Sequence, residues 1–140
     1  MTTRKATGDA GEALAVAFLE SLHGYRIVDT NVRLGSKRDG LGGELDIVGW
    51  DGETLCFVEV KTRTVTPETR DESPAESVTP AKQAQIARLA IAYALRNGLL
   101  DDSAEVPLRF DVVAVRRSVF RGQESSTCEL IRSAFYAPEE

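Results

Sequence analysis

The sequence has one histidine and two cysteines among 140 residues, and this scarcity excludes several kinds of site. A zinc site of the H-E-x-x-H kind, or a nuclease centre built on several histidines, needs more than His23. His23 stands near the predicted end of the first helix, where a capping or surface role is expected. Cys56 and Cys128 have no Cys or His partner at metal-ligand spacing, so we interpret both as small buried hydrophobic residues.

Long apolar runs are also absent. The chain has no run of about 18 apolar residues, the length that suffices to cross a bilayer. Its first residues, MTTRKATGDAGE, contain no apolar segment of the kind that directs export. We therefore expect a cytoplasmic protein that has no membrane partner.

Charge is unevenly distributed along the chain. The formal net charge is −5, which taken alone disfavours a polyanionic partner. Residues 64–79, 99–106 and 139–140 together have a net charge of −8, so the rest of the chain has a net charge of +3. A nucleic-acid partner therefore remains compatible with the composition.

Apolar patterns and helix signals predict an α-β-β-β-α-β-β order, which means a mixed sheet flanked by helices. Residues 8–24 form the first predicted helix, which has Asp9 as N-cap, stops at Gly24 and should be buried on nearly every side. The second helix has Thr79 as N-cap and Pro80 at its first position. Strands are predicted at residues 25–34, 44–50, 54–61, 108–115 and 127–135.

Two segments have the composition of loops. Residues 35–43, GSKRDGLGG, are predicted to be a flexible glycine-rich loop. Residues 64–79 are rich in Pro, Ser, Thr and Glu and lack apolar periodicity, which predicts a mobile surface loop. The chain length and the absence of an internal repeat predict a single domain over residues 1–140.

Residues 43–63, GELDIVGWDGETLCFVEVKTR, contain the best hairpin signal of the chain. Asp51-Gly52 separates two apolar strands and predicts a two-residue turn that places position 50 opposite position 53. Because residues two apart share one face of a strand, this register brings the charged residues of both strands to the same side of the sheet.

Four charged residues interrupt these two strands. In the predicted register Glu44 lies opposite Glu59, and Asp46 is diagonal to Glu59. Like charges in direct opposition are destabilising, and a divalent cation with oxygen ligands is the simplest compensation. Lys61 follows Glu59 by two residues and would bring a positive charge to the same place.

Glu12 is a fourth candidate carboxylate. The residues three, four and seven positions further on are apolar, so Glu12 lies on an apolar side of the predicted helix. A buried carboxylate needs a partner, which a metal ion or Lys61 would supply. A capping box formed by Asp9 and Glu12 is the structural alternative.

The other charged residues also have structural alternatives. Glu-x-Lys alone is typical of a solvated strand face, and Asp46 alone fits a turn or a salt bridge. The joint pattern is more specific: Glu-x-Asp is followed by Glu-x-Lys, with thirteen residues from Asp46 to Glu59 and all side chains on one face.

The segments GELDIV and FVEVKTR, with a Glu on the preceding helix and VTPAKQAQI after a loop, resemble the YraN-like family. The similarity extends from GDAGEALA through RFDVV to SAFY. That bacterial family is assigned to the PD-(D/E)xK nuclease superfamily and is similar to archaeal-type Holliday-junction resolvases. The resemblance implies an α/β fold with a restriction-endonuclease-like α-β-β-β-α-β core.

The resemblance also implies the roles of site residues. Asp46, Glu59 and the Val60 carbonyl would hold Mg²⁺ or Mn²⁺, Lys61 would be the catalytic lysine, and Glu12 the acidic residue of the first helix. Glu44 is a further candidate ligand because of its predicted place beside them. In this sequence a Leu replaces the Pro of the PD motif, which leaves Asp46 itself in place.

The implied activity is metal-assisted hydrolysis of phosphodiester bonds in structured DNA, branched or single-stranded. No base-reading module is visible, and a homodimer is compatible with the sequence. A catalytically silent nuclease fold that binds nucleic acid or a protein partner is the alternative. Candidates for contacts with backbone phosphates, each of which could equally be an ordinary solvated side chain, are Arg33, Lys37, Arg38, Arg63 and Lys82.

Overall fold

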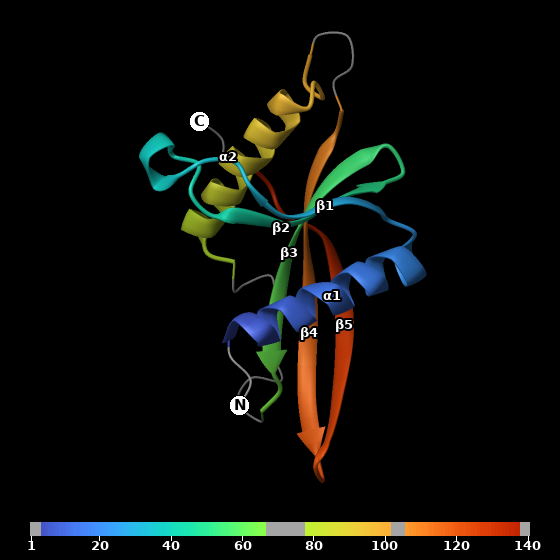
Figure 1. The fold of residues 1–140 in the computed structure, drawn as a ribbon. Coiled ribbons are helices and arrows are strands. Elements are labelled where there is room, and N and C mark those ends of the chain that lie inside the picture. The colour runs from blue at the N-terminus through green and yellow to red at the C-terminus, as the bar shows by residue number, and fades with distance from the viewer. Residues whose placement is uncertain (1–3, 67–77, 102–105, 138–140) are drawn as a thin grey trace.

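A computed structural model describes residues 4–66, 78–101 and 106–137 (Figure 1). A single 3-10 turn, η1 (Lys37–Asp39), lies between its first two strands. Neither of the helices described has the length and hydrophobicity needed to cross a membrane. In chain order, the other elements are α1 (Arg4–His23), β1 (Arg26–Arg33), β2 (Glu44–Asp51), β3 (Thr54–Thr64), α2 (Pro80–Arg96), β4 (Leu108–Phe120) and β5 (Gln123–Phe135).

The strands form one mixed sheet between two helices. Their spatial order follows the chain, β1-β2-β3-β4-β5, and every neighbouring pair is antiparallel except β3–β4. The parallel pair requires a crossover connection, which contains α2. α1 and α2 pack against apolar clusters on opposite faces of the sheet (Figure 1). The predicted fold class, a restriction-endonuclease-like α/β core, is confirmed.

The start of α1 differs from the prediction. The helix begins at Arg4, so Asp9 lies inside it and is not its N-cap. The capping-box alternative for Glu12 is therefore wrong as well. The predicted end is correct, because Gly24 follows the helix with a φ of +69°.

α1 contacts the sheet through a narrow stripe. Ala15 and Leu19 are fully buried, whereas Leu14 and Leu22 are 41% and 74% exposed, so the expectation of burial on nearly every side is wrong. Gly11 allows the close approach, because a Cβ at that position would collide with the Thr62 side chain of β3. The next residue, Glu12, is thereby held near the sheet.

α2 begins as predicted. Thr79 Oγ1 accepts a hydrogen bond of 3.2 Å from Lys82 N, and Pro80 is the first helical residue. The cap fixes the backbone of the first turn, from which the Lys82 side chain starts. The helix buries one apolar side against the sheet, made by Ile86, Ala87, Leu89, Ala90, Tyr93 and Ala94.

The β2–β3 hairpin has a different register from the predicted one. Asp51 pairs with Thr54, so the turn consists of Gly52 and Glu53, and the pairing is shifted by two residues. Gly52 has a φ of +61°, which glycine adopts without steric cost. A shift of two residues leaves every side chain on its predicted face, because the period of a strand is two.

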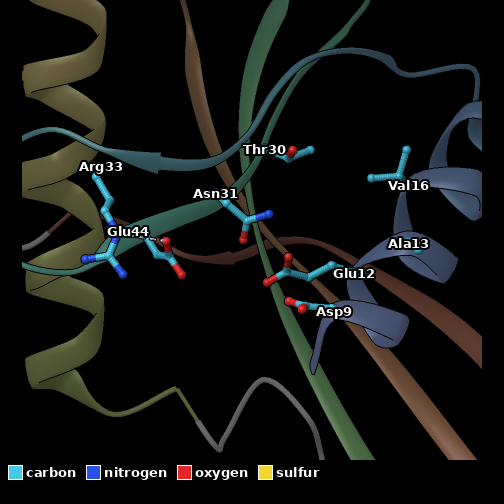
Figure 2. A pocket seen from close by; sticks show the side chains of 8 residues that line it. All are labelled: Asp9, Glu12, Ala13, Val16, Thr30, Asn31, Arg33 and Glu44. Atoms are coloured by element: carbon cyan, nitrogen blue, oxygen red, sulfur yellow. Dashed lines mark ion pairs between the residues drawn. The ribbon is translucent and has the colours of Figure 1, made fainter. Parts of the chain in front are cut away.

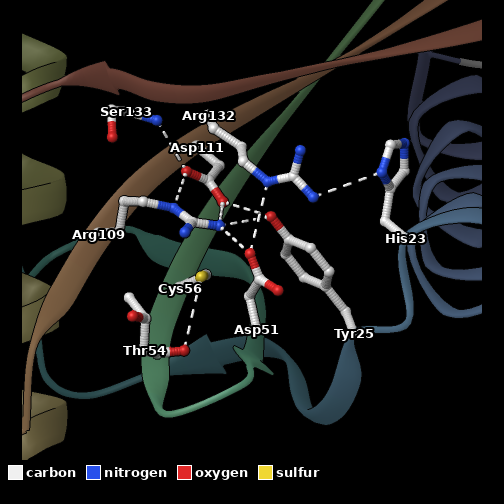
Figure 3. Close-up of polar contacts among 9 residues, drawn as sticks. All are labelled: His23, Tyr25, Asp51, Thr54, Cys56, Arg109, Asp111, Arg132 and Ser133. Atoms are coloured by element: carbon white, nitrogen blue, oxygen red, sulfur yellow. Dashed lines mark hydrogen bonds and ion pairs between the residues drawn. The ribbon is translucent and has the colours of Figure 1, made fainter.

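A buried polar cluster ties β2, β4 and β5 to Tyr25, which follows the end of α1 (Figure 3). Asp111 is completely buried, and Arg109 donates to its two oxygens at 2.9 and 3.0 Å. The Tyr25 hydroxyl and Ser133 N donate to the same carboxylate at 2.8 and 3.0 Å. Arg109 also donates to Asp51 Oδ2 at 2.8 Å. With this many donors, the buried charge is well compensated.

The segment 64–79 is described only at its ends. Thr64 completes β3, and Val78 is buried in the cluster beneath α2. Residues 67–77, where most of the predicted mobile loop falls, lie outside the described residues. The predicted mobility of this loop and the single-domain organisation stay predictions.

Removing the Asp111 carboxylate should destabilise the fold, because the largely buried Arg109 would lose its main partner. We expect Asp111→Ala to lower the free energy of unfolding, measured by urea denaturation, by about 3–5 kcal/mol. Glu20→Ala, at an exposed position of α1, is the control and should change it by less than about 0.5 kcal/mol. A loss below about 1 kcal/mol for Asp111→Ala would contradict this role.

Candidate active site

β2 and β3 separate where the predicted carboxylates lie. Ile47 and Val58 are the last residues that pair between these strands, and the rest of β2 pairs with β1. Asp46 lies in the opening, where its Oδ2 accepts a hydrogen bond of 2.9 Å from Val60 N. A side-chain oxygen thus satisfies a strand N–H, and the same bond turns Asp46 toward Glu59.

Glu59 is the second carboxylate, and only 7% of its surface is exposed. Lys61 Nζ lies 3.8 Å from Glu59 Oε1, and Lys82 Nζ lies 4.0 Å from the same oxygen. Lys61 shares the face of β3 with Glu59, whereas Lys82 reaches across from the first turn of α2. The structure therefore brings Asp46, Glu59 and Lys61 together and adds Lys82 to them.

Burial and repulsion disfavour two ionised carboxylates at this place. Burial, and after it the charge of Asp46, raises the pKa of Glu59 to about 7. Burial raises the pKa of Asp46 too, although the hydrogen bond from Val60 N opposes the shift. The two groups also hydrogen-bond to each other, which favours a protonated Glu59 that donates to an ionised Asp46. Without a further cation, the pair holds a proton that isolated carboxyl groups would have lost.

A groove of about 650 Å³ opens between α1 and the strands β1 and β2 (Figure 2). Glu12 projects into it from α1, and burial followed by the charge of Asp46 raises the Glu12 pKa. The Asn31 side chain points toward Glu12 and hydrogen-bonds to its carboxylate (Figure 2). Asn31 has a φ of +52°, a conformation that Asn tolerates better than most residues. Glu12 thus points from α1 toward the place where Asp46 lies.

Glu44 does not lie opposite Glu59, so that part of the hairpin prediction is wrong. Its ladder partner is Arg33 on β1, and Arg33 Nε lies 3.5 Å from Glu44 Oε2. The two-residue register shift makes Asp46, and not Glu44, level with Glu59. In addition, the pairing of β2 with β3 begins only at Ile47, which leaves Glu44 paired on the β1 side only. Glu44 lines the far end of the groove (Figure 2).

The predicted phosphate contacts lie on both sides of the carboxylate pair. Arg33, Lys37 and Arg38 are exposed on β1 and in η1, and Arg63 is exposed near the end of β3. Lys82 is the exception, because its ammonium group lies against Glu59 and not in open solvent. Of the exposed cations, Arg33 lines the groove beside Glu44. None of these four cations forms an ion pair with Asp46 or Glu59 among the described residues.

α2 holds the glycine-rich loop 35–43 in place. Gln85 Nε2 donates to Gly42 O at 2.7 Å, and Arg88 Nε donates to Gly40 O at 3.3 Å. Within the loop, Asp39 Oδ1 accepts from two backbone N–H groups, and these bonds lower the Asp39 pKa. The loop that was expected to be flexible is thus tied to the helix that carries Lys82.

The donor set suits a hard divalent cation that keeps part of its water shell. Within the described ranges, no three His, Cys, Asp or Glu side chains converge on a position that would hold an ion. Two carboxylates, Asp46 and Glu59, do meet, with the backbone of Val60 beside them. Mg²⁺ is commonly bound by one or two carboxylates together with waters and substrate phosphates, so these residues fit Mg²⁺ or Mn²⁺.

Two features of this site were not predicted from the sequence. Asn31 was part of a predicted strand. The only feature of the sequence that could have indicated its role is that Asn, unlike most residues of a strand, tolerates a left-handed backbone conformation. Lys82 was considered only as a phosphate contact, because the fold of α2 over β3 places it beside Glu59 and no local pattern reports such a contact.

The raised pKa of Glu59 makes stability depend on pH. In EDTA, the folded protein holds the Glu59 proton up to about pH 7, whereas the unfolded chain releases it near 4.5. The free energy of unfolding of the wild type should therefore fall as the pH rises from 5 to 7, by roughly 1–3 kcal/mol. Glu59→Gln should reduce this slope, and Glu53→Gln, in the exposed turn, should keep it. Equal slopes in all three proteins, measured by urea denaturation, would contradict the shift.

Comparisons with known proteins identify the family. The sequence model of the Uncharacterised protein family UPF0102 matches residues 11–115. A UPF0102 protein of Geobacter sulfurreducens is 48% identical over 111 residues, which are 79% of this chain and 76% of the relative. A UPF0102 protein of Symbiobacterium thermophilum is 44% identical over 131 residues, 93% of this chain and 96% of the relative. The resemblance to YraN-like proteins is thereby confirmed, and the chain belongs to the UPF0102 (YraN) family, a PD-(D/E)xK nuclease-like group.

Proposed function

We propose that this protein is a Mg²⁺- or Mn²⁺-dependent endonuclease that hydrolyses phosphodiester bonds in branched or single-stranded DNA. The observation that carries the proposal is the Asp46–Glu59 pair with two lysine ammonium groups within 4.0 Å of Glu59. Buried carboxylates with raised pKa values beside cations are typical of functional sites. Membership of a nuclease-like family supports the same conclusion.

Each polar group of the site has a role in the proposed reaction. Asp46 and Glu59, together with the Val60 carbonyl, would hold the metal ion, and Glu59 gives up its proton when it does so. The ion would supply Lewis-acid polarisation of the scissile phosphate and lower the pKa of a bound water. Lys61 would orient the attacking water and stabilise the negative charge that develops on the phosphate oxygens.

Lys82 and Glu12 complete the arrangement. Lys82 Nζ lies beside Glu59 Oε1, and it would be available to a phosphate oxygen of the substrate once the ion is bound. Glu12, oriented by Asn31, faces the groove and can accept a hydrogen bond from a water bound beside Asp46. The exposed cations on both sides, Arg33, Lys37, Arg38 and Arg63, would contact the DNA backbone without reading its sequence.

A bound metal should stabilise the protein. At a free ion concentration of ten times Kd, Mg²⁺ or Mn²⁺ should add about 1.4 kcal/mol and raise the wild-type Tm by roughly 5 °C. Asp46→Asn should lose most of this response. In EDTA above pH 7, where Glu59 loses its proton, it should be at least as stable as the wild type, because the amide oxygen can still accept from Val60 N and the repulsion with ionised Glu59 is gone.

A structural salt bridge predicts the opposite sign for the same measurement. If Asp46 serves only the fold, Asp46→Asn in EDTA should unfold at a lower temperature than the wild type. That result, together with a wild-type Tm that does not respond to either ion, would leave the metal site without support.

Cleavage tests the reaction itself. Wild-type protein should cut four-way junctions, flaps or single-stranded DNA in Mg²⁺ or Mn²⁺ and should not cut in EDTA. Glu59→Gln and Lys61→Ala should each reduce the rate by about 10²-fold or more, as expected for the loss of transition-state charge stabilisation. Arg26→Ala, an exposed cation at the far end of β1, is the matched control and should retain the rate.

The same assay distinguishes the proposed endonuclease from the alternative, a catalytically silent nuclease fold that only binds. Binding of these DNAs without cleavage in either ion, by a protein whose Tm shows no metal response, would favour the silent fold.

A further inference from the structure

The β4–β5 hairpin extends well beyond the rest of the sheet. β4 pairs with β5 down to Phe120 and Gln123, whereas its pairing with β3 ends at Thr64 and Arg117. The sequence predicted strands only to residue 115 and from residue 127, because the residues between have no apolar alternation. Figure 1 shows the resulting two-stranded ribbon, which projects past α1 at the foot of the molecule.

One face of this ribbon continues directly from the candidate active site. In the parallel ladder Glu59 is level with Val112 and Arg63 is level with Arg116. Because alternate residues share a face, the side that carries Glu59 and Lys61 continues through positions 116, 118 and 120 of β4. The opposite face is the one that α1 covers, since Val113 and Val115 belong to its apolar cluster.

The continuation is polar and positively charged. Arg63 is exposed and forms no ion pair with any carboxylate of the described residues. Arg116 is half-buried and pairs with Glu129 at 2.7 Å, an exposed contact that a phosphate group can replace. Small hydroxyl side chains stand between these arginines and the tip of the ribbon, namely Ser118, Ser125 and Thr127.

The tip of the same face is aromatic. Phe120 is 72% exposed, and the Arg121 guanidinium lies 5.3 Å from the centre of its ring. A Phe with this exposure contributes little to the core, and its ring face is accessible to a stacking partner. Cationic strips that end in aromatic side chains are the recurrent recognition elements for single-stranded nucleic acids.

We propose that the β4–β5 ribbon binds a single-stranded nucleic-acid arm that leaves the active site. Arg63 and Arg116 contact its phosphates, the hydroxyl groups donate to the backbone, and Phe120 stacks on a base. The proposal rests on the proposed function for the direction of the strand, because the strand would start at the scissile phosphate, beside the metal ion that Asp46 and Glu59 would hold.

The geometry sets the length of the arm. Phe120 lies eight residues beyond Val112, which is level with Glu59. At about 3.3 Å per strand residue this is about 26 Å. A strand with the stacked spacing of about 3.4 Å per nucleotide covers that distance with about eight nucleotides, and an extended strand needs fewer. An arm of two nucleotides cannot reach the ring, and one of twelve can.

The test measures binding, so it does not depend on cleavage. Wild type and variants are titrated in EDTA against fluorescent duplexes with overhangs of two or twelve nucleotides, of 5′ and 3′ polarity, and against the blunt duplex. Phe120→Ala should weaken binding to a twelve-nucleotide overhang of one polarity at least about fivefold, and should leave two-nucleotide overhangs and the blunt duplex unchanged. Phe120→Tyr should restore the affinity, since a phenol ring also stacks.

Two controls exclude simpler explanations. Val119→Ala removes a side chain that is 65% exposed on the opposite face of the tip, and should have no effect on any of these DNAs. Arg63→Gln should weaken binding to long overhangs and reduce the slope of log K against log salt by about one, whereas Arg26→Gln should not.

Each alternative outcome is distinct. Equal losses for Phe120→Ala on long overhangs, short overhangs and blunt duplex, or no loss at all, overturn the proposal. A shift of Phe120→Ala from dimer to monomer in sedimentation, with unchanged DNA binding, also overturns it and assigns the tip to a second copy of the chain. Length-dependent binding without cleavage in Mg²⁺ or Mn²⁺ would instead refute the proposed function and leave the ribbon assignment standing.

Discussion

The hydrogen bond from Val60 N to Asp46 determines where the groups of the site meet. It forms because the pairing of β2 with β3 begins only at Ile47, so that the N–H of Val60 has no β2 carbonyl opposite it and the Asp46 carboxylate takes that place. The same bond holds Asp46 next to Glu59, although burial and like charge oppose their proximity. α1 reaches this opening through Gly11 and α2 through its capped first turn, which is how Glu12 and Lys82 arrive from opposite faces of the sheet.

The carboxylate of Asp111 and the Asp46–Glu59 pair differ in how completely they are hydrogen-bonded. Asp111 is surrounded by donors from Arg109, Tyr25 and Ser133, so its charge is satisfied within the fold (Figure 3). Asp46 and Glu59 have fewer donors than acceptor positions, and burial, which these donors do not offset, raises the pKa of both groups. A fold that can satisfy one buried carboxylate completely, and leaves a neighbouring pair short of positive charge, has the pattern of a structural cluster beside a functional site.

Local sequence patterns predicted the element order and the shared face of the carboxylates, because strand period and turn residues act over a few positions. They misplaced the hairpin by two residues, since Asp51-Gly52 and Gly52-Glu53 are both acceptable turns and only the packing of the strands decides between them. The prediction that Glu44 lies opposite Glu59 was wrong for a related reason, because no local signal marks the residue at which the pairing between β2 and β3 ends. The Arg109–Asp111 cluster and the Lys82 contact join residues that are far apart in sequence, so they became visible only in the folded chain.

Charge balance connects the carboxylate pair to the substrate that we propose. Fully ionised, Glu12, Asp46 and Glu59 bring three negative charges, and Lys61 and Lys82 supply two positive ones. Glu44 is already neutralised by Arg33 and adds nothing. Burial is the main reason why the pair keeps a proton in the absence of metal, and the remaining deficit of one charge acts in the same direction. A divalent ion that displaces this proton leaves the site with one excess positive charge, which a single phosphodiester neutralises, so ion and substrate phosphate should stabilise each other there.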